Sequence, residues 1–74
     1  MNRKLELTAV IEKEDDMYIS LCPELDIASQ GETLEDAKSN LIEALELFFE
    51  SASESEIKKR LQNDLQITTV TVNV

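Results

Sequence analysis

The first third of the chain alternates apolar and polar residues in two short runs. Alternation with a period of two is typical of a β-strand that buries one face. The first run places Leu5, Leu7, Ala9 and Ile11 at every second position. A polar break at residues 13–16 precedes the second run, residues 17–22, so the sequence predicts an antiparallel hairpin. We expect the main core face of the second strand to carry Met17, Ile19 and Leu21, and the opposite face of the hairpin to carry Thr8, Val10, Tyr18, Ser20 and Cys22.

A turn and a third strand follow the hairpin. Pro23 cannot donate a ladder hydrogen bond, so the second strand should end there and the chain should turn through residues 24–26. Residues 27–30 then predict a short strand. Gly31 suits the corner that leads into a helix, because glycine accepts backbone conformations that a side chain would resist.

A long amphipathic helix is predicted to begin at Thr33. Thr33 and Asp36 have the spacing of a capping box, and acidic residues in the first turn favour the positive end of a helix. One stripe is apolar and should meet the sheet: Leu34, Ala37, Leu41, Ala44, Leu45, Phe48 and Ala52, widened by Ile42 and Phe49. The other side is an acidic ridge, which we define as Glu35, Asp36, Glu43, Glu46 and Glu50.

The chain ends with a strand-like segment. Residues 51–55 lower the helix propensity, residues 57–61 can form a short helical turn, and residues 65–74 are rich in β-branched side chains. We therefore expect one α+β domain over residues 1–74, with the order β-β-β-α-β. Its sheet would be an antiparallel meander with a final parallel strand beside the first, strand order 3-2-1-4, and one main helix packed on it.

The last strand would lie at an edge of this sheet. It contains no Lys, Pro or Gly that would discourage pairing with another chain. A domain of 74 residues also has a small core. We expect a homodimer, with Val70, Val72 and Val74 as candidate residues for self-association.

The charge of the chain restricts its partners. Sixteen acidic and seven basic residues give a formal net charge of −9, which repels nucleic-acid phosphates and favours encounter with a basic partner. The alternative is that the acidity serves only solubility. We expect no direct binding of nucleic acid.

The sequence offers little for catalysis. It has no histidine, a single glycine and a single cysteine, Cys22, so neither a His-dependent triad, a glycine-rich phosphate loop nor a zinc site can be assembled. We expect no enzyme activity, catalytic residue, cofactor or metal. Without a long apolar run or an export signal, the protein is expected to be soluble and cytoplasmic, where its lone thiol stays reduced.

The order of the motifs resembles the HicB-type antitoxin domain. The resemblance runs from Leu5 to Phe49 and is carried by the turn Cys22-Pro23-Glu24-Leu25 and by Gly31, Thr33, Asp36 and Ala37 at the helix start. It implies a partial ribonuclease H-like fold with strand order 3-2-1-4. It also implies a short form without the DNA-binding domain that many members of the family carry.

The resemblance further implies a protein that binds and neutralises a small basic ribonuclease toxin of the HicA type. The candidate residues for binding it are Tyr18 and the acidic ridge, Glu35, Asp36, Glu43, Glu46 and Glu50. A solvated helix face is the plainer interpretation of that ridge. The alternative function is a solitary homo-oligomeric domain that binds a different protein or a small molecule.

Overall fold

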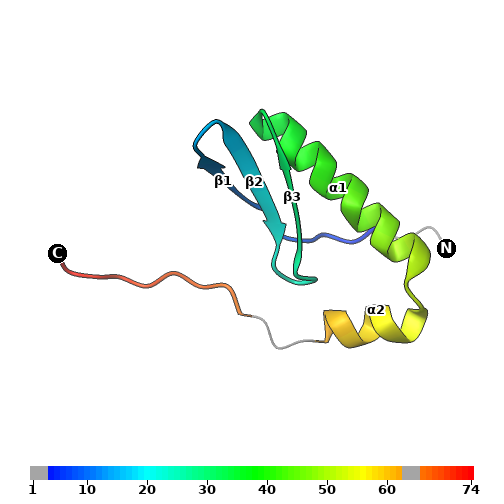
Figure 1. The fold of residues 1–74 in the computed structure, drawn as a ribbon. Helices are drawn as coiled ribbons and strands as arrows, with labels where there is room; N and C mark the ends of the chain where they lie inside the picture. The colour runs from blue at the N-terminus through cyan, green and yellow to red at the C-terminus, as the bar shows by residue number, and fades with distance from the viewer. Residues whose placement is uncertain (1–3, 63–65) are drawn as a thin grey trace.

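The computed structural model of the chain describes residues 4–62 and 66–74, and it contains a three-stranded sheet with a long helix against one face (Figure 1). All neighbouring strands are antiparallel, in the order β1-β2-β3. The α+β class and the three-stranded meander are therefore confirmed. The elements are β1 (Val10–Glu14), β2 (Met17–Cys22), β3 (Ile27–Gly31), α1 (Leu34–Ser51) and α2 (Glu54–Leu61).

The first strand lies later in the chain than its alternation predicts. β1 includes Lys13 and Glu14, the first half of the stretch that we interpreted as a polar break, and Glu14 pairs with Met17. The hairpin loop is therefore Asp15-Asp16 alone, with Asp15 at a positive φ of 56°. The ladder begins at the pair Val10↔Leu21. Since β2 ends at Cys22, it offers no partner to most of residues 4–9, and these residues form no strand.

The predicted buried face is wrong for β2, whereas Leu7 and Ile11 of the first run lie on the buried side as expected: Leu7 packs on the core cluster, and Ile11 pairs with Ser20. Ser20 and Cys22 are fully buried, and the Ser20 hydroxyl donates a 2.8 Å hydrogen bond to the carbonyl oxygen of Ala37 in α1. The helix therefore covers the face that carries the small side chains. Their small size explains the choice, because it lets the helix backbone approach the sheet closely. The bulkier set, Met17, Ile19 and Leu21, lies on the open face and is only partly buried.

Gly31 is required by this close approach. Its φ is not positive, so the expected conformational reason does not apply. A Cβ atom at residue 31 would lie 2.5 Å from the backbone nitrogen of Ala37. Beside it, the predicted cap is confirmed: the Thr33 side chain accepts a 3.0 Å hydrogen bond from the Asp36 amide.

The core lies between α1, α2 and the end of the sheet where β2 finishes and β3 begins. Cys22, Leu25 and Leu41 are its buried cluster, and the side chains packed against them are Leu7, Ile27, Leu45, Phe48, Phe49 and Leu61. Ala37 and Leu41 confirm the apolar stripe of α1, whereas Leu34 and Ile42 remain exposed.

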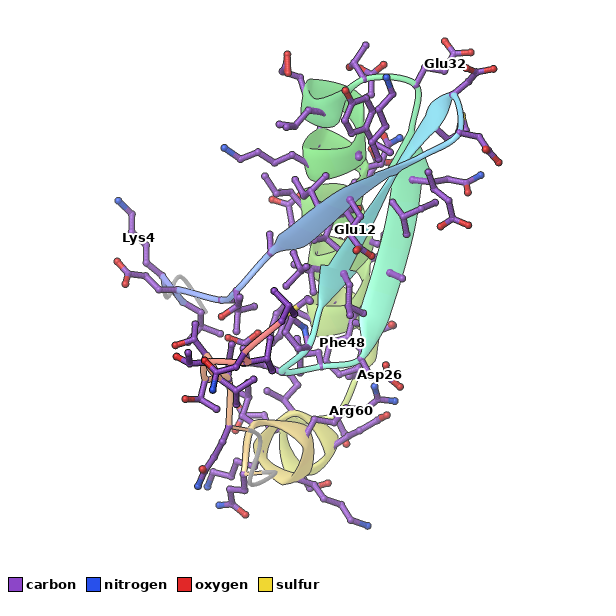
Figure 2. All side chains as sticks on the ribbon, turned by 90° about the vertical axis from the view of Figure 1, so that its left-hand side faces the viewer. Lys4, Glu12, Asp26, Glu32, Phe48 and Arg60 are labelled. Carbon is purple, nitrogen blue, oxygen red and sulfur yellow. The ribbon has the colours of Figure 1, made fainter. Side chains whose placement is uncertain are left out.

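Helix α2 closes the end of this core. It is longer than the expected turn because the Ser53 side chain caps it by accepting from the Glu56 amide. Arg60 holds it in place: its guanidinium donates to the carbonyl oxygen of Leu25 at 2.9 Å and stands 5.0 Å from the centre of the Phe48 ring (Figure 2).

The expected fourth strand is not present in the single chain. Residues 66–74 have no regular secondary structure, and Figure 1 shows them leading away from the sheet and helices. Residue 65, where that strand was expected to begin, lies outside the described residues. The exposed fractions of Val70 and Val72 are 81% and 72%, and Val74 is fully exposed. The structure thus does not show the order 3-2-1-4 or a parallel final strand.

Candidate partner-binding surface

The acidic ridge lies on the solvent side of α1. All five of its residues, Glu35, Asp36, Glu43, Glu46 and Glu50, are exposed. Lys38 is the only basic residue of this helix. Within residues 4–62 and 66–74 the single salt bridge joins Arg60 to Glu56, at 3.7 Å, and both belong to α2. The ridge therefore offers its carboxylates to a cationic partner without first breaking an ion pair of the described chain.

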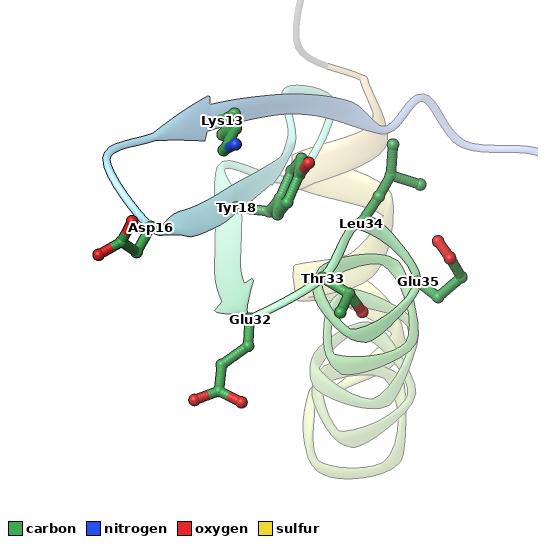
Figure 3. Close-up of a pocket in the computed structure, with 7 residues that line it drawn as sticks. All are labelled: Lys13, Asp16, Tyr18, Glu32, Thr33, Leu34 and Glu35. Carbon is green, nitrogen blue, oxygen red and sulfur yellow. The ribbon is translucent and has the colours of Figure 1, made fainter.

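Tyr18 and the beginning of the ridge line one shallow hollow. It lies where the β1–β2 hairpin faces the N-terminal end of α1 (Figure 3). Tyr18 reaches it from β2, on the face that the helix covers, and so not on the face where we expected this side chain. The residues that line the hollow are Lys13, Asp16, Tyr18, Glu32, Thr33, Leu34 and Glu35.

The hollow is more acidic than basic. Asp16, Glu32 and Glu35 line it, whereas Lys13 is its only cation, with the nitrogen of its side chain 6.0 Å from the centre of the Tyr18 ring. An aromatic face with carboxylates around it can receive a Lys or Arg side chain through charge and cation–π attraction. The hollow therefore combines an aromatic ring, the neighbouring Lys13 and three acidic residues.

The structure brings together only part of the predicted binding set. Tyr18 and Glu35 share the hollow, and Asp36 follows directly in the first turn of α1. Glu43, Glu46 and Glu50 lie farther along the same helix. Together they extend an acidic strip from the hollow toward the C-terminal end of α1. The self-association residues, Val70, Val72 and Val74, lie on the separate C-terminal segment.

Sequence reasoning missed the contribution of the hairpin. Asp16 and Lys13 join the hollow because the hairpin loop has two residues and brings the ends of β1 and β2 beside α1. Glu32 joins it from the corner after β3. The available signal was the length of the break before Met17. If Lys13 and Glu14 are counted as strand residues, only two residues remain for the loop.

The open face of the sheet is a second candidate surface. Cross-strand neighbours share a face, so the pairs Val10↔Leu21 and Leu21↔Ala28 place three apolar side chains side by side. Ile19 and Met17 continue this group along β2. Val10 is 42% exposed. Glu12, opposite Ile19, adds a carboxylate (Figure 2).

Glu24 ties the N-terminal segment to the turn after β2. One of its carboxylate oxygens accepts from both the amide and the hydroxyl of Thr8, at 2.9 and 2.7 Å. Partial burial raises the pKa of this carboxyl, but the hydrogen bonds from the Thr8 hydroxyl and the backbone amides outweigh it, so the pKa lies below its usual range. The negative form of Glu24 is therefore favoured in the folded protein.

Cys22 is part of the core. Its side chain is fully buried, and its sulfur donates a weak hydrogen bond to the other Glu24 oxygen at 3.5 Å. Burial raises the pKa of this thiol, and the neighbouring Glu24 adds to the rise. A thiol that stays protonated is a poor nucleophile. Cys22 therefore takes the place of a small hydrophobic side chain in the core.

No metal-ligating group is found in the part of the chain that the structure describes: no three Cys, Asp or Glu side chains there converge closely enough to hold an ion. Likewise, neither α1 nor α2 has the length together with the apolar composition that a bilayer crossing requires.

A comparison with known proteins identifies a relative of this chain. A protein of Synechocystis sp. with the name "UPF0150 protein ssl0738" is 45% identical to this chain over 53 residues, which is 69% of this chain and 74% of the relative. No family model and no solved structure matches the chain. Identity of this degree over most of both chains establishes common descent, and the chain therefore belongs to the UPF0150 family, which is the HicB-like family.

Proposed function

We propose that this protein is an antitoxin: it acts in the cytoplasm by binding a small basic ribonuclease toxin and neutralising it. The proposal rests on membership of the HicB-like family together with one structural observation. That observation is the acidic strip, which begins at the hollow around Tyr18 and continues along the exposed side of α1.

The acidic ridge and the hollow next to it carry the charge that would attract a basic toxin. The carboxylates of the ridge are exposed, and Lys38 is the only cation on the helix that carries them. With a net charge of −9 on the whole chain, attraction at long range should speed the encounter with a basic protein, and added salt should slow it. A Lys or Arg of the toxin would then enter the hollow beside the Tyr18 ring, where Glu32 and Glu35 add negative charge to its lining.

Charge reversal with a matched control tests the place of contact. The ridge variant carries Glu43→Lys, Glu46→Lys and Glu50→Lys, and the control carries Glu6→Lys, Glu14→Lys and Glu54→Lys, three exposed positions outside α1 and the hollow. Each set changes the net charge by six, from −9 to −3. The partner is the product of a small basic reading frame adjacent to this gene, bound in stopped-flow mixing at low salt.

We expect the ridge variant to associate about tenfold or more slowly than the control, because local rather than total charge governs docking. A second variant, Tyr18→Ala, should raise the dissociation rate while leaving association nearly unchanged. Equal association rates for the ridge and control variants would mean that the ridge is only a solvated face.

Co-expression tests the function itself. The antitoxin should restore growth of cells that produce the neighbouring basic protein, and the ridge variant should restore it less well than the control. If the unmodified chain relieves the toxicity of no adjacent basic protein, the antitoxin proposal fails, and a homo-oligomeric domain with a different partner takes its place.

We also propose that the protein has no nuclease activity of its own. A metal-dependent nuclease of related fold needs carboxylates that converge on paired ions, and the first half of this chain places Glu12 and Glu14 on the open sheet face, away from the helix. Pure protein with labelled RNA or DNA and Mg²⁺ or Mn²⁺ should leave both polymers intact. Cleavage abolished by one Asp or Glu substitution would contradict this.

A further inference from the structure

Two segments of the chain have the composition of strands but no strand beside them. Residues 4–9 alternate Leu5 and Leu7 with polar side chains, and residues 66–74 alternate Val70, Val72 and Val74 with Thr and Asn. The ladders β1–β2 and β2–β3 include neither segment. Both therefore expose backbone amides and carbonyls that a neighbouring strand could pair.

The open edge of the sheet is the one that residues 4–9 continue. β3, at the opposite edge, lies beside α1, and the Asn40 side chain already donates to the carbonyl oxygen of Gln30 at 2.8 Å. β1 pairs with β2 on one side and, within the described chain, with no strand on the other. An added strand would therefore find its free hydrogen-bonding groups along residues 4–14, apart from the Thr8 amide, which already donates to Glu24.

The C-terminal segment matches that edge in length and chemistry. Its nine residues would span about 30 Å as a strand, and the eleven residues 4–14 about 36 Å, at about 3.3 Å per residue. It contains no charged side chain, so it can approach a second acidic copy without the repulsion that the rest of the chain creates. In its own chain it leads away from the sheet, with Val74 fully exposed (Figure 1).

We propose that residues 66–74 of each chain form a fourth strand along the 4–14 edge of a second copy. The exchange is reciprocal, so one two-fold axis satisfies both tails and both open edges. Each sheet then has the order β3-β2-β1 followed by the partner's tail. Pairing extends the first strand back toward Leu5, which accounts for the alternation there, and it covers Val70 and Val72.

A proline scan tests the pairing. In an edge strand only alternate amides face the neighbouring strand, and proline is tolerated where the amide faces solvent. We expect light scattering to show a dimer of the unmodified chain at tens of micromolar. Proline at Val70 and Val72, or instead at Thr69 and Thr71, should raise the dimer dissociation constant about tenfold, while the intervening positions have little effect. A monomeric parent chain, or a dimer indifferent to all four prolines, would overturn the proposal.

A cross-link separates exchange between copies from pairing within one chain. The double variant Ala9→Cys and Thr71→Cys, treated with a short bismaleimide, should give a covalent dimer on a denaturing gel. A cross-linked monomer would show that the tail folds back on its own sheet, and would refute the exchange. The parent chain, with only the buried Cys22, serves as the control.

This proposal is independent of the antitoxin function. The pairing involves no residue of the acidic ridge, and so the variant with Glu43→Lys, Glu46→Lys and Glu50→Lys should remain a dimer.

Discussion

Thr8 donates its backbone amide and its hydroxyl to the same carboxylate oxygen of Glu24, although sixteen positions separate the two residues. This pair fixes the N-terminal segment against the turn after β2, so that Leu7 can pack on the core cluster. Because the hydrogen bonds favour the charged carboxylate, they link the stability of the fold to pH.

Glu24→Gln should therefore lower the free energy of unfolding at pH 7 by about 1 kcal/mol, since a neutral amide accepts hydrogen bonds more weakly. The folded pKa of Glu24 lies below its usual value of 4.5. The carboxylate thus stabilises the fold fully above pH 4.5, and this contribution is lost as the pH falls through the folded pKa. Urea titrations should show the difference between the two proteins shrinking on acidification. Glu43→Gln, on the exposed helix face, is the control, and a difference independent of pH would refute the linkage.

Gly31→Ala should destabilise the fold strongly. The added Cβ would meet backbone atoms of Asp36 and Ala37, at 2.7 and 2.5 Å, and these cannot move aside as a flexible side chain could. We expect a loss of about 2 kcal/mol, the usual size for overpacking, in thermal or urea unfolding. Gln30→Ala at the neighbouring exposed position should cost much less. If Gly31→Ala and Gln30→Ala lowered the free energy of unfolding equally, helix α1 would be able to move away from the added Cβ at little cost.

Asp26→Gly should stabilise the protein. Asp26 has a φ of 54°, a conformation that costs residues with a side chain free energy and costs glycine almost nothing. We expect a gain of about 0.5 kcal/mol. Asp26→Asn removes the charge but keeps the side chain, and Asp26→Ala should lower the stability. If alanine stabilised the fold as much as glycine, removal of a negative charge would be the cause.

Ser20→Ala should lower the free energy of unfolding by about 1 kcal/mol, because the buried hydroxyl donates to the Ala37 carbonyl between the sheet and α1. Ser29→Ala, on the neighbouring strand in register with Ser20, is the matched control and should have the smaller effect. If the two losses are equal, the hydrogen bond to Ala37 contributes nothing measurable.

Local signals predicted most of the elements. The alternation of residues 17–22, the Pro23 turn and the Thr33 cap each depend on neighbours in the sequence, and each is found where it was expected. The first and last residues of β1 depend instead on which residues of β2 are available for pairing. The pattern of residues 5–11 alone does not contain this information. The local pattern therefore placed the first strand too early in the chain.

The choice of buried face could not be made from hydropathy. Met17, Ile19 and Leu21 are more apolar than Tyr18, Ser20 and Cys22, yet α1 covers the second set. Where the helix comes closest, the buried side chains of β2 are the small Ser20 and Cys22, and hydropathy carries no information about the distance between a helix and a sheet. The same reversal moved Tyr18 from the open face to the hollow near Glu35.

The uncharged C-terminal segment has a consequence for solutions at high concentration. A run of β-branched residues without charge or proline is the kind of segment that can stack into a cross-β fibril, with chains about 4.8 Å apart. Such stacking would add nine negative charges at every step of the fibril, because each tail is attached to a domain of net charge −9. The negative charge of the domain therefore opposes fibril growth, and this opposition weakens as salt screens the charges.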